Sequence, residues 1–174
     1  MKTTPGMNAR TNWFHILIPV GGLAMLVGAI DPMEGSLVIL PGSGLVALGT
    51  FLGHGQRRLL AYRVGVFILI ALGVVALWGL SGLGGFGGTS GRSNWWGLLL
   101  LPYLVGWPLG ICGPGLPRWI QVLGIGVGLW YLSIGAKLSN GIGIVLFTLG
   151  LLTIGGCLWR LSRRNPEPAS LPLA

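Results

Sequence analysis

Hydrophobic positions along this chain fall into six long runs, separated by short breaks that are rich in Gly, Pro, Ser or Asn. The runs predict helices near residues 13–30, 32–53, 60–80, 95–112, 119–138 and 142–159. Each run approaches or reaches the roughly 20 residues that an α-helix needs to cross a bilayer. The breaks, such as "GHGQRR" and "GPGLPR", have the composition of turns. We therefore predict an all-α, polytopic integral membrane protein with about six transmembrane helices and short loops.

The composition agrees with this class. Hydrophobic residues make up 52% of the chain and charged residues only 8%, whereas a soluble domain carries about 25% charged residues. So few charges cannot cover the surface of a soluble protein. We predict a short N-terminal segment at 1–12, a single transmembrane domain at 13–159 and a disordered, Pro-containing tail at 160–174.

Basic residues are distributed unequally between the two sides that six spans create. Nine of the eleven lie in the N-terminal segment, the second and fourth loops and the C-terminal tail, and the other side holds only Arg92 and Lys137. This bias predicts that both termini are cytoplasmic, and the short loops suggest a bacterial inner membrane. The basic residues occur in ones, twos and threes at the ends of apolar runs, which suits anionic lipid and argues against nucleic acid.

Two of the three acidic residues, Asp31 and Glu34, stand in the break "DPMEGS". Asp31 suits a helix N-cap, Pro32 suits the first helical position, and Glu34 has the spacing of a capping box. We predict that the second span begins at Pro32. An additional pairing of these acids with Arg92 or Lys137 on the same outer side remains an alternative, and a catalytic or ion-binding role for this outer polar cluster is the least favoured one.

Residues that carry chemistry are scarce inside the predicted spans. No Asp or Glu lies at mid-depth, although cation-coupled transport and intramembrane hydrolysis depend on such groups. His15 and His54 are predicted near the cytoplasmic ends of spans, and Cys112 and Cys157 are predicted as small buried residues without a disulfide framework. The sequence therefore predicts no catalytic residue, no metal site and no cofactor.

Prolines interrupt the second and fourth spans, at Pro41, Pro102 and Pro108. Broken helices can line a binding site, because each Pro leaves a backbone carbonyl without its helical donor. The nearest uncharged polar residues are the candidates for lining such a cavity: Ser43, Tyr103 and Gln121.

Glycine is abundant, with 33 residues, and small residues let helices approach closely in a bilayer. We expect the GxxxG pairs Gly124/Gly128 and Gly49/Gly53 to pack within the chain. Trp107 and Trp130 lie away from the ends of the runs, and we expect them to pack between helices.

These patterns favour a non-enzymatic accessory, assembly or structural subunit that acts through helix contacts in the bilayer with another membrane protein or with a second copy. The alternative is a small permease or channel-like protein for a neutral solute, with its site between spans two and four. A lipid-modifying enzyme that uses the outer polar cluster is the third possibility.

Overall fold

The computed structural model describes residues 5–31, 34–53, 56–84, 94–138 and 141–163. Its elements follow the chain in the order α1 (Pro5–Gly28), α2 (Ser36–Gly53), α3 (Arg57–Gly82), the 3₁₀ helix η2 (Asn94–Leu100), α4 (Leu101–Cys112), α5 (Arg118–Lys137) and α6 (Gly141–Ser162). Every element in these ranges is helical, so the all-α prediction is confirmed.

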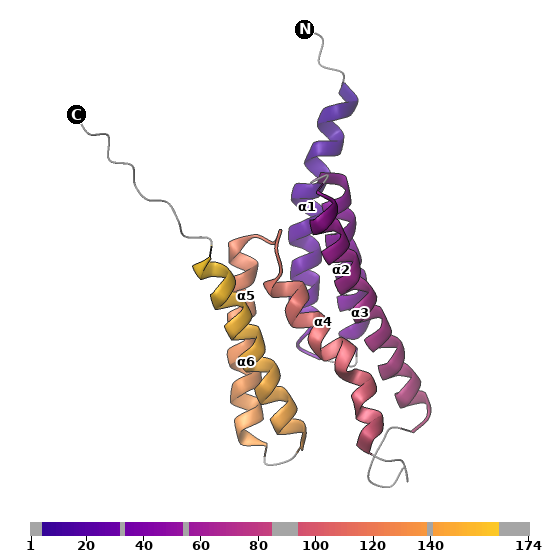
Figure 1. Cartoon of the computed structure of the whole chain (residues 1–174), viewed down its shortest axis with the longest axis vertical. Coiled ribbons are helices and arrows are strands. Elements are labelled where there is room, and N and C mark those ends of the chain that lie inside the picture. The colour runs from indigo at the N-terminus through magenta and orange to yellow at the C-terminus, as the bar shows by residue number, and fades with distance from the viewer. Residues whose placement is uncertain (1–4, 32–33, 54–55, 85–93, 139–140, 164–174) are drawn as a thin grey trace, which may run out of the picture.

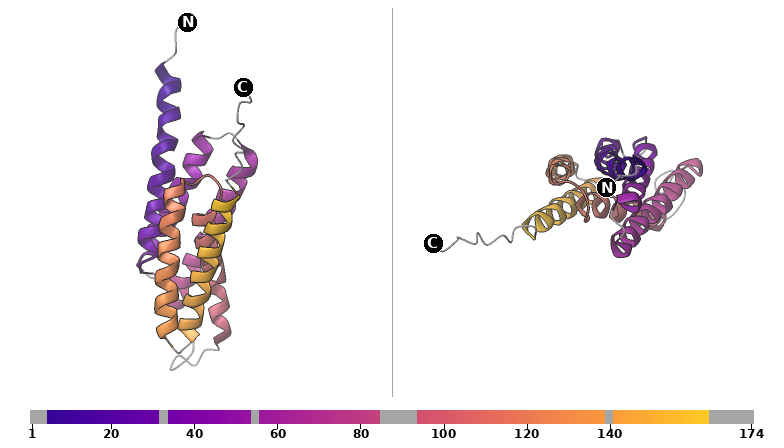
Figure 2. Two further views of the ribbon diagram at one scale, coloured as in Figure 1. Left: turned by 90° about the vertical axis from the view of Figure 1, so that its left-hand side faces the viewer. Right: turned by 90° about the horizontal axis from the view of Figure 1, so that it is seen from above.

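The helices run up and down in an elongated bundle, with the start of α1 and the end of α6 toward the same end (Figures 1 and 2). Four helical stretches are long and apolar enough to cross a membrane: Ser36–Gly53, Arg57–Gly82, Arg118–Lys137 and Gly143–Ser162. Shorter apolar stretches cover His15–Gly28 in α1 and Leu98–Cys112 across η2 and α4. The bundle thus has the composition of a membrane protein along its whole length.

Helices α1 and α2 form one tight hairpin, and glycines make it possible. A Cβ at Gly21 would lie 2.5 Å from the carbonyl oxygen of Gly42, and a Cβ at Gly49 would lie 2.9 Å from the Ile18 side chain. Any larger residue at these positions would push the two backbones apart. The expectation that Gly49 packs within the chain is confirmed.

Helices α5 and α6 form a second hairpin of the same kind. A Cβ at Gly128 would lie 2.8 Å from Ile154, and one at Gly135 would lie 2.6 Å from the backbone nitrogen of Phe147. Gly124 faces Cys157 of α6 and also Ile111 of α4. Gly124 and Gly128 therefore pack within the chain, as expected.

Helix α4 lies between the two hairpins and contacts α3 on one side and α6 on the other (Figure 2). Gly106 of α4 packs against Ile70 of α3, and Trp107 is only 2% exposed. Trp107 thus packs between helices as expected. The same expectation is wrong for Trp130, which is 42% exposed, because its face of α5 points out of the bundle.

The turn before α2 contains the predicted cap in part. The Glu34 N–H donates to Asp31 Oδ1 at 3.3 Å, which is the contact expected of an N-cap residue. Helix α2 itself begins at Ser36 and not at the predicted Pro32, which lies outside the described residues. A Cβ at Gly35 would overlap the Gly28 and Asp31 carbonyl oxygens, so this segment forms a tight turn against the end of α1 before the regular helix starts.

Candidate functional site

The residues predicted as an outer polar cluster do not form a connected site in the described part of the chain. Asp31, Glu34 and Lys137 are all exposed and lie toward the end of the bundle opposite the start of α1. Neither Glu34 nor Lys137 forms an ion pair among the described residues. Arg92, the fourth candidate, lies outside the described residues.

The three candidates for a polar cavity are also separate. The Ser43 hydroxyl donates to the Leu40 carbonyl within its own helix at 2.8 Å. Tyr103 lines a cavity of about 40 Å³, between α2, α4 and α5, that neither Ser43 nor Gln121 lines. A cavity of this size has room for about one water molecule. The interior between spans two and four is therefore packed.

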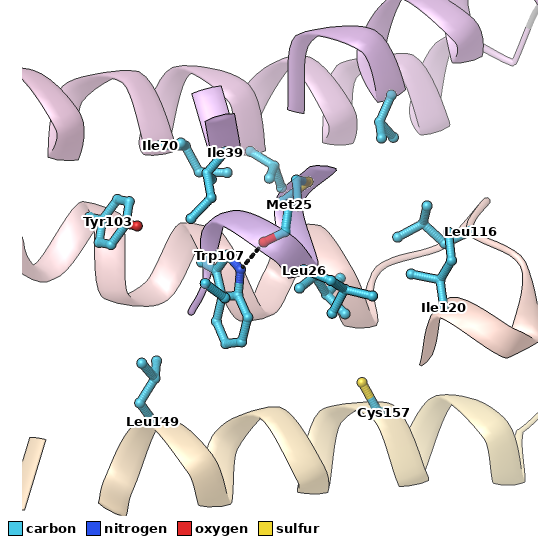
Figure 3. Packing of buried hydrophobic residues seen from close by; sticks show 14 of the residues in the cluster. Met25, Leu26, Ile39, Ile70, Tyr103, Trp107, Leu116, Ile120, Leu149 and Cys157 are labelled. Atoms are coloured by element: carbon cyan, nitrogen blue, oxygen red, sulfur yellow. Dashed lines mark hydrogen bonds between the residues drawn. The ribbon is translucent and has the colours of Figure 1, made fainter. Parts of the chain in front are cut away.

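The polar groups of the core bind the carbonyl end of α1. Trp107 Nε1 of α4 donates to the Met25 carbonyl at 3.0 Å (Figure 3), and the Tyr131 hydroxyl of α5 donates to the Ala29 carbonyl. The two rings meet edge to face with centroids 5.7 Å apart. Since the last carbonyls of a helix have no partner within it, these side chains supply donors that lipid cannot.

The carbonyl end of α4 is capped in the same way by α3. The Tyr62 hydroxyl donates to the Leu109 carbonyl at 2.7 Å, and Arg63 Nη1 donates to the Gly110 carbonyl at 2.7 Å. Arg63 Nη2 donates to the Pro114 carbonyl in the following turn. Arg63 is 2% exposed. Because its guanidinium group donates to carbonyls at the end of α4, its charge lies at the negative end of the α4 dipole.

These caps were missed by sequence reasoning, which placed Arg63 among the basic residues of a loop. Tyr62 and Arg63 lie 47 residues before the carbonyls of Leu109 and Gly110 that they bind. A single sequence contains no signal for such a pairing. The local sign in the sequence was that Arg63 stands inside the predicted apolar run 60–80.

The two cysteines meet between α4 and α6. Their sulfur atoms lie 2.6 Å apart, and Cys112 Sγ also donates to the Thr153 carbonyl at 3.3 Å. Both cysteines are free, Cys157 is buried and Cys112 is half-buried. The sequence predicted two small buried residues but gave no indication that they touch.

Gln121 is the most unusual polar residue of the interior. Its side chain is fully buried, and neither Oε1 nor Nε2 has a hydrogen-bond partner among the described residues. An unpaired amide in an apolar interior costs free energy.

A groove of about 550 Å³ lies on the outside of α1 and α5. Each side contributes four positions with the spacing i, i+3, i+4, i+7, which places them on one face. They are Leu23, Leu26 and Val27 of α1 with Ile30 in the turn that follows it, and Leu123, Gly126, Val127 and Trp130 of α5. All eight are apolar, so the groove is suited to an apolar partner.

Across the described ranges, no group of three or more His, Cys, Asp or Glu side chains is placed to hold a metal ion. No protein-family model, characterised protein or solved structure showed significant similarity to this chain.

Proposed function

We propose that this chain is a multi-pass protein of the cell membrane that acts as a non-enzymatic accessory or assembly subunit and holds a transmembrane helix of another membrane protein in the groove between α1 and α5. The observation that carries the proposal is the groove itself. Its volume of about 550 Å³ is lined by two matching stripes of apolar residues. A third helix can lay an apolar face along such a pair of stripes.

Gly126 is the position that most favours a helix as the occupant. Gly124 and Gly128 on the same helix pack against α4 and α6, but a Cβ at Gly126 would meet nothing within 4 Å. Packing within the chain therefore does not explain this glycine. In a bilayer, a small residue on a helix surface lets a second helix approach closely.

The packed interior favours this proposal over a permease. The cavity next to Tyr103 measures about 40 Å³ and is enclosed mainly by Ile39, Trp107, Tyr131 and other large apolar side chains. A solute pathway needs polar groups along a wider passage.

The distribution of charge supports the orientation in the proposal. The end of the bundle where α1 begins carries the described basic residues Arg57, Arg58, Arg118, Arg160 and Arg163. Lys137 belongs to the other end. The positive-inside rule assigns the arginine-rich end to the cytoplasm, and both chain termini with it.

The test compares two glycine substitutions in protein purified from native membranes in a mild detergent. Gly126→Leu fills the groove, whereas Gly65→Leu adds the same side chain to α3, at a glycine that also has no neighbour within 4 Å. Leu is the better helix former, so both variants are expected to fold, which circular dichroism will check. Native mass spectrometry of the wild type and of Gly65→Leu should show a stoichiometric membrane-protein partner that Gly126→Leu lacks.

Two results would contradict the proposal. One is a partner that stays bound to Gly126→Leu as firmly as to the wild type. The other is a strictly monomeric wild type that transports a neutral solute into liposomes, which would favour the permease. A mass equal to two copies of this chain, lost in Gly126→Leu, would identify the groove partner as a second copy.

A further inference from the structure

The arginine-rich end of the bundle carries buried positive charge without an acidic partner. The chain has three acidic residues: Asp31 and Glu34 belong to the opposite end, and Glu167 lies outside the described residues. Within the described part of the chain, Arg63 and Arg160 therefore have no carboxylate. A buried charge without a counter-charge is costly, so an anion at this end would stabilise the fold.

Arg160 is the residue with hydrogen-bonding capacity left over. Its Nε is buried and has no hydrogen-bond partner among the described residues, and the same holds for Nε of Arg63. Arg160 is close enough to Tyr62 and Arg63 for its charge to act on both. Both Nη atoms of Arg63 already donate to carbonyls and Arg63 is 2% exposed, whereas Arg160 is half-buried, so Arg160 is the guanidinium group that an anion can reach.

Gln121 sits at the same level of the bundle. Helices α5 and α6 run antiparallel, and Gly124 packs against Sγ of Cys157. Gln121 lies three residues before Gly124 and Arg160 lies three residues after Cys157. Each is therefore one helical turn closer to the arginine-rich end, on the face of its helix that carries the contact between Gly124 and Cys157. The amide of Gln121, which has no hydrogen-bond partner among the described residues, can therefore add a neutral donor beside the Arg160 guanidinium group.

An apolar groove of about 150 Å³ lies between α4 and α6. On α6 it is lined by Leu152 and Gly156, and Arg160 is the next residue on the same i, i+4 stripe. On α4 it is lined by Val105, Pro108, Leu109 and Cys112. The carbonyl of Leu109 binds the Tyr62 hydroxyl, so the α4 wall also ends beside Tyr62 and Arg63.

We propose that this is a binding site for an anionic phospholipid, whose phosphate binds Arg160 and whose acyl chain lies in the groove between α4 and α6. A phosphate group matches guanidinium donors in charge and geometry. The groove supplies an apolar path of the kind that an acyl chain, unlike free phosphate, can use. The site is separate from the α1–α5 groove and does not depend on the function proposed for that groove.

The test titrates purified wild-type protein in detergent with phosphatidylglycerol, with phosphatidylcholine of the same acyl chains, and with inorganic phosphate, and counts bound molecules by native mass spectrometry. Arg160→Gln should weaken phosphatidylglycerol binding about tenfold, the size expected for one charge-assisted hydrogen bond. Arg163→Gln removes the same charge at the same end, but Arg163 stacks on the Trp159 ring at 4.3 Å, so this control should leave binding within about twofold.

A second pair of variants tests the acyl-chain groove. Leu152→Trp fills the groove and should weaken phosphatidylglycerol binding without disturbing the fold, because Leu152 is 61% exposed. Leu151→Trp is the matched control, since Leu151 is 51% exposed but does not line the groove. Retained helical content in circular dichroism will show that both proteins are folded.

The proposal is overturned if the wild type binds the two lipids equally, or if Arg160→Gln binds phosphatidylglycerol as the wild type does. If inorganic phosphate binds as tightly as phosphatidylglycerol, and Leu152→Trp weakens neither, the ligand is free phosphate. That result would overturn the proposal of a phospholipid site. A preference for phosphatidylglycerol that appears only in Glu167→Gln would show that the tail carboxylate compensates Arg160, and would also overturn it.

Discussion

Replacing Gln121 by Met is expected to stabilise the protein, although the substitution removes a polar group from the interior. The side chain is fully buried, and within the described part of the chain neither of its amide atoms has a hydrogen-bond partner. Leaving a buried polar group unsatisfied costs roughly 1–3 kcal/mol, whereas a swap to an apolar side chain of similar length and volume costs little through packing. The free energy of unfolding should therefore rise by about 1–3 kcal/mol.

The assay is unfolding of the purified protein by titration of sodium dodecyl sulfate into mild detergent micelles, followed by far-ultraviolet circular dichroism. Val122→Met is the control, because Val122 is the next residue on α5 and is 56% exposed; its unfolding free energy should change by less than about 0.5 kcal/mol.

A Gln121→Met protein that is less stable than the wild type would refute the reasoning. It would mean that the amide has a partner in the folded protein, such as a bound water or anion. If lipid is kept in the sample, the phosphate site inferred above predicts that the gain shrinks, since the amide would then donate to that ligand. Measuring the gain with and without phosphatidylglycerol separates the two situations.

Three further predictions concern the packing of the bundle. Trp107→Phe should lower the unfolding free energy by about 1–3 kcal/mol in the same titration, because the Met25 carbonyl loses its donor at 3.0 Å; an unchanged value would contradict this cap. Gly135→Ala should destabilise the protein, since its Cβ would lie 2.6 Å from a backbone nitrogen of α6, while Gly155→Ala, with nothing within 4 Å, should be neutral or stabilising. Mild oxidation should link Cys112 to Cys157, whose sulfurs lie 2.6 Å apart, and peptide mapping after alkylation would show the cross-link; two fully alkylated thiols would count against this contact.

The helices themselves could be predicted from the sequence because apolar runs and turn residues are local signals. All six predicted runs correspond to helical segments, the run 95–112 being divided between η2 and α4, and the largest differences are at the starts of α1 and α2. Helix α1 begins at Pro5, eight residues before the predicted span, because a helix can extend past the apolar stretch that crosses the bilayer. Helix α2 begins at Ser36, because the turn at Gly35 is shaped by its contact with α1.

The candidate sites could not be predicted in the same way. Arg63 and Gln121 owe their importance to burial, and burial depends on which helices become neighbours. The pairing of Cys112 with Cys157 and of Trp107 with Met25 joins residues 45 and 82 positions apart. Hydrophobic periodicity identifies the faces of each helix but does not say which face meets which neighbour.

The capping of the α1 end has a consequence for how the chain is made. The carbonyls of Met25 and Ala29 receive their donors from Trp107 and Tyr131, which lie 82 and 102 residues later. During synthesis, the α1–α2 hairpin therefore reaches the membrane long before the ribosome has produced the residues that complete it. Its glycine contacts can form at once, but its carbonyl end stays exposed to lipid until α4 and α5 arrive. A chain that stops before α4 therefore lacks both donors, and the carbonyls of Met25 and Ala29 stay without them.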